Sequence, residues 1–231
     1  MKSQQQVSTV PRRLTLEALK LGMLALLVCA SVSAQVNIDD LKIQSDAGDK
    51  AATRRLAEAY YLGQGVDQDF KLAAHWYEKL AKQGDRRAQT SLGLMYARGY
   101  GVEKNVATAR KWWNFAAAQN DPGAQFNLGT LYLEGAGVAQ NYADAVRWYR
   151  EAASRGHVQA QFNLGMMYFE GKGVERELGW AYYWLAVASE QGDEDARTQI
   201  GKVAAGMSAT QIREAEARAK DWMKNAKKAW Q

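Results

Sequence analysis

A period of 36 residues runs through most of the chain and constrains its fold more than any other feature. Two of the units begin with the same letters, AQFNLG, at Ala124 and Ala160. The positions that align in this register are Ala52, Ala88, Ala124, Ala160 and Ala196, then Leu56, Leu92, Leu128, Leu164 and Ile200, then Trp76, Trp112, Trp148 and Trp184. A fixed period of this length is typical of stacked supersecondary units, so the sequence predicts a repeat architecture.

Each unit is predicted to contain two helices. Ala52, Leu56 and Tyr60 follow one another at intervals of four, which places them on one side of a helix. Expected N-caps are Asp49, Asp85, Asp121 and Asp193 for the first helices and Asp69, Asn105 and Asn141 for the second; expected helix-ending glycines are Gly63, Gly99, Gly135 and Gly171. The in-phase tryptophans are expected to fill the space between helices, whereas Trp113, Trp180, Trp222 and Trp230 fall out of phase. Neither helix can bury its apolar stripe alone, so the units must stack in an all-α solenoid.

The two ends of the repeat region differ from its interior. Residues 39–47 match the second half of a unit, which predicts a lone helix before the first full unit. At the other end, Ser208 and Gln211 form a capping box for a helix over about 209–226. We expect the apolar face of that helix to cover the open end of the solenoid. The predicted organisation is a leader over 1–34, an N-terminal half-repeat over 35–49, four full units and a partial fifth over 50–206, and a C-terminal capping helix with a basic tail over 207–231.

The first 34 residues have the pattern of a secretory signal peptide. Basic residues precede an apolar run from Leu21 to Val32, and small residues lead to Ala34, after which we expect cleavage. The run is shorter than the roughly 20 residues that a membrane-spanning helix needs. We therefore expect a periplasmic or secreted protein with no integral membrane span after cleavage. Two alternatives are an uncleaved leader that anchors the chain and lipidation of Cys29.

The composition excludes several classes of protein. The single cysteine rules out an intramolecular disulfide, and two histidines without a cysteine cluster are too few ligands for a structural zinc site. The leader holds four of the 30 Lys and Arg residues and one of the 25 acidic residues, so the rest of the chain has a net charge of +2. This near-balance argues against a nucleic-acid partner, which would require a sustained basic face.

No arrangement of residues in the chain predicts catalysis, a cofactor or a metal. His75 and His157 lie in different units, and His157 is at an N-cap position, where we expect an exposed helix start. The glycine pairs such as Gly63 and Gly65 lack the G-K-[ST] ending of a phosphate-binding loop. We interpret them as structural turns.

The pattern A-x-x-x-L-G-x-x-Y-x-x-G-x-G-V, followed by A-x-x-W-Y and A-A-x-x-G, resembles the Sel1-like repeat over about residues 40–206. That family is related to the tetratricopeptide repeat. The resemblance implies a right-handed α-solenoid of antiparallel helix pairs with a concave groove, and a role as a scaffold or adaptor. Some exported relatives have disulfide-linked repeats and are associated with β-lactams, but these repeats contain no cysteine, so that chemistry does not carry over.

The resemblance to the Sel1-like repeat and the lack of a catalytic pattern in the sequence together predict a non-catalytic scaffold of the bacterial envelope. It is expected to bind a protein or peptide partner through the groove. The candidate groove residues are the carboxamides Gln125, Asn127, Gln161 and Asn163, which can both donate and accept hydrogen bonds. The competing interpretation is that these side chains bond to neighbouring helices. The alternative function is an envelope enzyme or a protein that binds cell-wall fragments or β-lactams.

Overall fold

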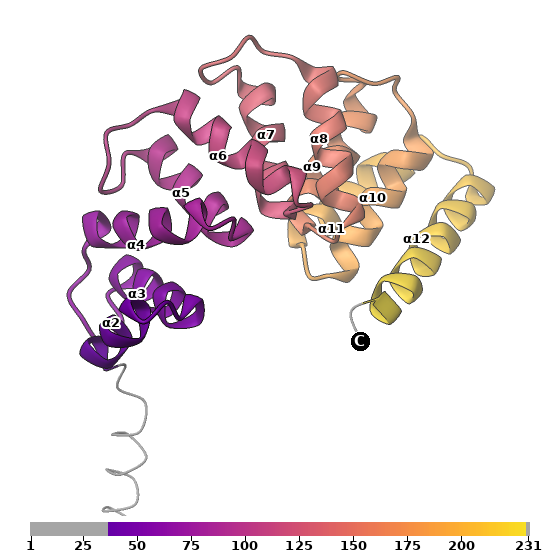
Figure 1. Cartoon of the computed structure of the whole chain (residues 1–231). Helices are drawn as coiled ribbons and strands as arrows, with labels where there is room; N and C mark the ends of the chain where they lie inside the picture. Colours follow the sequence, from indigo (N-terminus) through magenta and orange to yellow (C-terminus); the bar gives the residue numbers. More distant parts are fainter. Residues whose placement is uncertain (1–36, 230–231) are drawn as a thin grey trace, which may run out of the picture.

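The computed structural model describes residues 37–229, which are helical throughout apart from turns and contain no strand. The helices are α2 (Ile38–Asp46), α3 (Lys50–Leu62), α4 (Phe70–Lys82), α5 (Arg86–Arg98), α6 (Val106–Ala118), α7 (Pro122–Glu134), α8 (Tyr142–Ser154), α9 (Val158–Glu170), α10 (Leu178–Glu190), α11 (Glu194–Ala204) and α12 (Ala209–Ala229). Figure 1 shows them along an arc, with α2 and α12 at its two ends. The expected leader, its cleavage after Ala34 and the lipidation of Cys29 lie outside the described residues, as does Trp230.

Four complete units follow one another as helix pairs, each with a first helix (α3, α5, α7, α9) and a second helix (α4, α6, α8, α10). Every second helix contacts the first helix of its own unit and the first helix of the next. The fold is therefore the all-α solenoid that the period predicts. None of the helices between residues 37 and 229 combines the length and apolar composition needed to cross a bilayer.

The predicted helix starts and ends are confirmed. The Asp49 carboxylate accepts hydrogen bonds from the N–H groups of Ala51 and Ala52, and the Asp121 carboxylate accepts one from Ala124. The left-handed glycines that end the first helices are Gly63, Gly99, Gly135 and Gly171. After α6, where the other units have glycine, Asn120 takes this conformation with φ 61°. Asparagine tolerates it better than most residues with a side chain.

In the second, third and fourth units the paired helices approach closely at a glycine in the first helix, whereas the first unit has Ala57 at this position. A Cβ added at Gly129 would lie 2.6 Å from the ring of Tyr149, and one added at Gly165 would lie 2.8 Å from the side chain of Leu185. At Gly93 it would overlap the indole of Trp113. Each of these glycines thus leaves a hole on the surface of the first helix, and one bulky side chain of the second helix fills it.

This arrangement corrects the expected role of the in-phase tryptophans. The residues that fill the space between helices stand one position later, at Tyr77, Trp113, Tyr149 and Leu185, and all four are buried. Trp113 therefore belongs to the core although it is out of phase with the repeated tryptophans, and its indole N–H donates to the carbonyl of Thr90 at 3.2 Å. Trp76, Trp112 and Trp148 are only partly buried, and Trp184 alone of the in-phase set is buried.

The last helix begins as predicted, and its apolar residues pack on the end of the solenoid. The backbone N–H of Ser208 donates to the side chain of Gln211 at 2.8 Å, and the Gln211 N–H donates to the Ser208 hydroxyl, which completes the capping box. However, α12 lies against α10 instead of pairing with α11, the first helix of the incomplete fifth unit. The connection explains the difference: residues 205–208 replace the seven-residue turn, such as 63–69, that reverses the chain within each complete unit.

Candidate functional site

One side of the four first helices is only partly covered, and we call it the first-helix face. It is defined by two positions in each unit, one helical turn apart. Its residues are Arg54 and Glu58 in α3, Thr90 and Leu94 in α5, Phe126 and Thr130 in α7, and Phe162 and Met166 in α9. The face is charged at its N-terminal end and becomes apolar toward α9.

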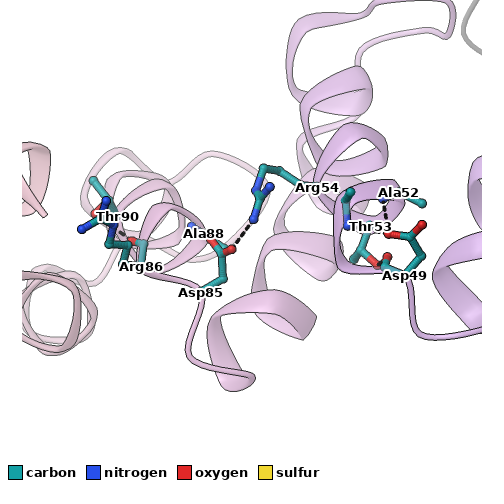
Figure 2. Close-up of polar contacts among 9 residues, drawn as sticks. Asp49, Ala52, Thr53, Arg54, Asp85, Arg86, Ala88 and Thr90 are labelled. Atoms are coloured by element: carbon teal, nitrogen blue, oxygen red, sulfur yellow. Dashed lines mark hydrogen bonds and ion pairs between the residues drawn. The ribbon is translucent and has the colours of Figure 1, made fainter. Parts of the chain in front are cut away.

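In the first three units, the first of these positions contacts the N-cap of the next first helix. Figure 2 shows the Arg54 guanidinium reaching from α3 to the Asp85 carboxylate, which also accepts a hydrogen bond from the backbone N–H of Ala88 at 2.9 Å. One unit later, the Thr90 hydroxyl donates to the Asp121 carboxylate at 2.9 Å.

In the third unit an aromatic pair replaces the polar one. The Phe126 ring stacks on the imidazole of His157, with centroids 4.4 Å apart and planes 14° apart. The His157 Nδ1 atom also accepts a hydrogen bond from the backbone N–H of Ala160 at 3.3 Å, so His157 is the N-cap of α9. The expected helix start at His157 is confirmed. Its expected exposure is wrong, because stacking leaves the His157 side chain partly buried.

These contacts shift two pKa values in the same direction. Burial opposes ionisation of Asp85, but hydrogen bonds from the N–H groups of Ala88 and Arg87 and the guanidinium of Arg54 outweigh it and hold the pKa below its ordinary value. Burial lowers the pKa of His157, with the nearby Asp121 charge opposing the shift. Both side chains are thereby kept in the form that can accept the cap hydrogen bond.

A cavity of about 350 Å³ opens on the first-helix face between α5 and α7. Leu94, Val106, Trp113 and Leu131 supply apolar lining. Polar groups around it come from Arg98, Lys104, Asn127, Thr130 and Glu134. An apolar site with a few polar groups is suited to one side chain of a partner, with the polar groups fixing the partner's backbone or charge.

The four predicted groove residues divide into two pairs. Gln125 and Gln161 are buried, so they do not form part of a groove surface. The Gln161 amide donates to the carbonyl of Ala153 at 3.1 Å and accepts from Gln191 at 2.6 Å, so it joins consecutive helices. Gln125 has one long bond of 3.5 Å, to the carbonyl of Ala117. For this pair the competing structural interpretation holds.

The two asparagines are partly exposed. Asn127 lines the cavity between α5 and α7. Asn163 lies beside the hydroxyl of Tyr149, where its hydrogen bond opposes the rise in the Tyr149 pKa that burial causes. Asn127 is thus the member of the predicted set that the structure brings to a cavity.

Sequence reasoning missed the residues that give this face its character. Leu94 and Phe126 were not singled out, although Phe126 stands between two residues that were predicted. The available signal was the variation at one repeat position, from Arg54 through Thr90 to Phe126 and Phe162. Among the residues described, no group of three His, Cys, Asp or Glu side chains is placed to hold a metal ion.

The fold and this face define the chain as a helical repeat protein whose first-helix face is partly apolar. Comparison with known families assigns the repeat: the Sel1 repeat matches residues 50–85, 86–121, 122–157 and 158–193, and the chain belongs to this family. Proteins with Sel1 repeats generally serve as scaffolds for protein interactions. The comparison with curated proteins finds no match.

Solved structures agree with this assignment. A Sel1 repeat protein from Oxalobacter formigenes is 32% identical, with a TM-score of 0.63 over 75% of this chain and 71% of that one. The protective antigen c5321 of uropathogenic Escherichia coli is 29% identical, with a TM-score of 0.62 over 80% of this chain, which spans about half (49%) of that protein. The immunity protein Pa5087 of Pseudomonas aeruginosa, at 20% identity and a TM-score of 0.50 over 84% of this chain and 79% of that one, shares the fold.

Proposed function

We propose that this protein is a non-catalytic scaffold of the bacterial cell envelope, exported by its leader, that binds a protein or peptide partner through the first-helix face. The observation that carries the proposal is the cavity between α5 and α7, which is lined by Leu94, Val106 and Leu131 and bordered by Arg98 and Lys104. The cavity thus places apolar side chains next to the positive charges of Arg98 and Lys104.

A partner segment with an apolar side chain next to a carboxylate would complement this cavity. The apolar group would be removed from water against Leu94 and Leu131, and the carboxylate would face Arg98 or Lys104. The Asn127 amide, which also lines the cavity, can pair with the partner's backbone. Recognition then depends on side chains that differ from unit to unit rather than on the repeated core.

Site-specific photo-crosslinking tests the proposal in cells. Leu94 is replaced by p-benzoylphenylalanine, and the matched control carries the same residue at Lys111, which is exposed on the second helix α6. We expect a discrete adduct in the envelope fraction from position 94 and none from position 111. Equal labelling from both positions, or no adduct from position 94, would contradict the proposal.

A further inference from the structure

The fifth unit consists of a first helix without its second helix. In the four complete units the second helix packs along the first, but α12 packs on α10 and leaves that side of α11 open. The sequence of α11 still follows the repeat, with Ala196, Ile200 and Gly201 in register with Ala160, Leu164 and Gly165. The helix therefore keeps the features that receive a second helix.

The clearest of these features is an unfilled hole at Gly201. The aligned glycines Gly93, Gly129 and Gly165 are each filled by a bulky side chain, so that an added Cβ would overlap it. At Gly201 an added Cβ would meet nothing within 4 Å. This internal comparison shows what occupies such a hole elsewhere in the same molecule.

A cavity beside Ile200 extends the open side of α11. It measures about 240 Å³. Its apolar lining comes from Ile200 of α11, Tyr182 and Ala186 of α10, and Ala219 of α12, and its polar lining comes from Ser189, Glu190, Glu216 and Lys220. Ile200 is partly exposed, whereas the aligned Leu164 is fully buried. Apolar surface that the other units bury is thus left uncovered here.

We propose that the open side of α11 binds an amphipathic helix of a partner protein that presents a Trp, Tyr or Leu side chain to Gly201. The second helices themselves define the motif, because each has a fully buried alanine four residues before its bulky residue. The pairs are Ala109 with Trp113, Ala145 with Tyr149, and Ala181 with Leu185. The inference deepens the proposed function by naming a second surface for the same scaffold role and the kind of helix that it takes.

The described helices of a second copy do not offer this motif in the repeat register. In α12 the aligned position is the exposed Asp221. In α2 the aligned positions are Asn37, which is not an alanine, and Leu41, which is already buried in the core of its own chain. Among the described helices none matches, so the proposal assigns the occupant to a different protein.

A peptide copied from α8 serves as the probe for this site. It spans residues 142–154, with Tyr149 as the bulky residue, and is held helical by a lactam between Glu151 and an Arg147→Lys change, since both positions are exposed in α8. Titration into the isotope-labelled, purified protein is followed by NMR. We expect saturable shifts of the Gly201 amide and the Ile200 methyl groups.

Matched variants separate this site from other surfaces. Gly201→Leu fills the hole and weakens the fitted Kd by about tenfold or more, while Lys202→Leu adds the same side chain at the neighbouring exposed position and leaves the Kd unchanged. A peptide carrying Tyr149→Ser does not bind. Each of these results supports the proposal.

Three results would overturn it. They are the absence of saturable shifts at Gly201, an unchanged Kd in Gly201→Leu, and sedimentation showing that α11 is covered by a second copy, with Gly201→Leu dissociating the dimer. Because the titration uses no cellular partner and no residue of the first-helix face, its failure leaves the crosslinking test from position 94 unaffected.

Discussion

In the N-terminal half of the solenoid, Arg54 of α3 pairs with the Asp85 carboxylate at the start of α5, whereas in the C-terminal half the Phe126 ring stacks on His157 at the start of α9. The backbone arrangement is the same, because both N-cap residues accept a hydrogen bond from the backbone three residues later. The repeat thus fixes the cap but leaves the contact between units free to be ionic or aromatic.

The two ends differ in a similar way. In α2, Asp40 and Gln44 are exposed, and so is Ile43, at 68%. The C-terminal end is covered by a helix from outside the pattern, which buries Ala215 and Ala219 against α10 but leaves Gly201 of α11 open. Among the described residues, α2 thus packs along the first helix α3, whereas α11 keeps a side that no second helix covers.

Removing each end helix should give the largest and most unequal effects. A chain ending at Ser208 exposes Tyr182 and Trp184 of α10, while a chain starting at Gly48 loses the burial of little more than Leu41. At roughly 1.5–3 kcal/mol per large side chain, loss of α12 should cost about 3–6 kcal/mol and loss of α2 about 1.5–3 kcal/mol. Urea unfolding followed by circular dichroism compares both with the chain 37–231. Equal losses of unfolding free energy would mean that the contact of α12 with α10 contributes no more than the contact of α2 with α3.

Glycine substitutions test filled and empty holes with the same chemical change. Gly129→Ala forces a methyl group into the Tyr149 ring and should destabilise the protein by about 1–3 kcal/mol. Gly201→Ala meets no atom within 4 Å and should stabilise it by about 0.5–1 kcal/mol through helix propensity. Thermal unfolding of the two variants measures the difference. If both variants lost stability, the Gly201 hole would be filled in solution.

Much of this arrangement could be predicted from the sequence, because the period, the capping residues and the helix-ending glycines are local signals. Local sequence signals do not show whether Trp112 or Trp113 enters the core. Both are aromatic and adjacent, and only the glycine at position 93, on another helix, decides which one enters the core. A one-residue shift rotates a helical side chain by about 100°, so the wrong choice places the wrong face inward.

The burial of Gln125 and Gln161 could not be predicted from the sequence, for a different reason. A carboxamide beside variable positions suggests a surface, yet the Gln161 amide meets the carbonyl of Ala153 eight residues earlier, on the preceding helix. That pairing depends on how consecutive units are placed, not on residue type. The first-helix face was likewise visible in the sequence only as variation along one repeat position, from Arg54 to Phe162.

The aromatic contact at His157 should make the C-terminal half sensitive to mild acid. Burial lowers the pKa of His157 below its ordinary 6.5, so the folded state favours neutral imidazole, which can cap α9. This contribution is complete above pH 6.5 and is lost as the pH falls through the lowered pKa. We expect unfolding free energy to drop by about 1 kcal/mol in the wild type between pH 7 and 5.

His157→Asp is the matched variant, since aspartate caps the other complete units. Aspartate stays ionised over this pH range, so the variant should show a flatter pH dependence even if its stability at pH 7 changes through loss of the Phe126 stack. Parallel pH profiles for the two proteins would show that the His157 cap does not titrate as the contact requires.

The ionic contact in the N-terminal half should give the smallest effect. Arg54 is partly exposed, so Arg54→Ala should cost only about 0.2–1 kcal/mol, and less in high salt. The more sensitive readout is the Asp85 carboxyl, whose pKa should rise toward its ordinary value when the guanidinium is removed. An NMR titration measures this rise, and Arg55→Ala, at the exposed neighbouring position, should leave the Asp85 pKa unchanged. If Arg54→Ala also leaves it unchanged, the backbone N–H groups of α5 alone hold the carboxylate, and the two halves of the solenoid differ in shape but not in electrostatics.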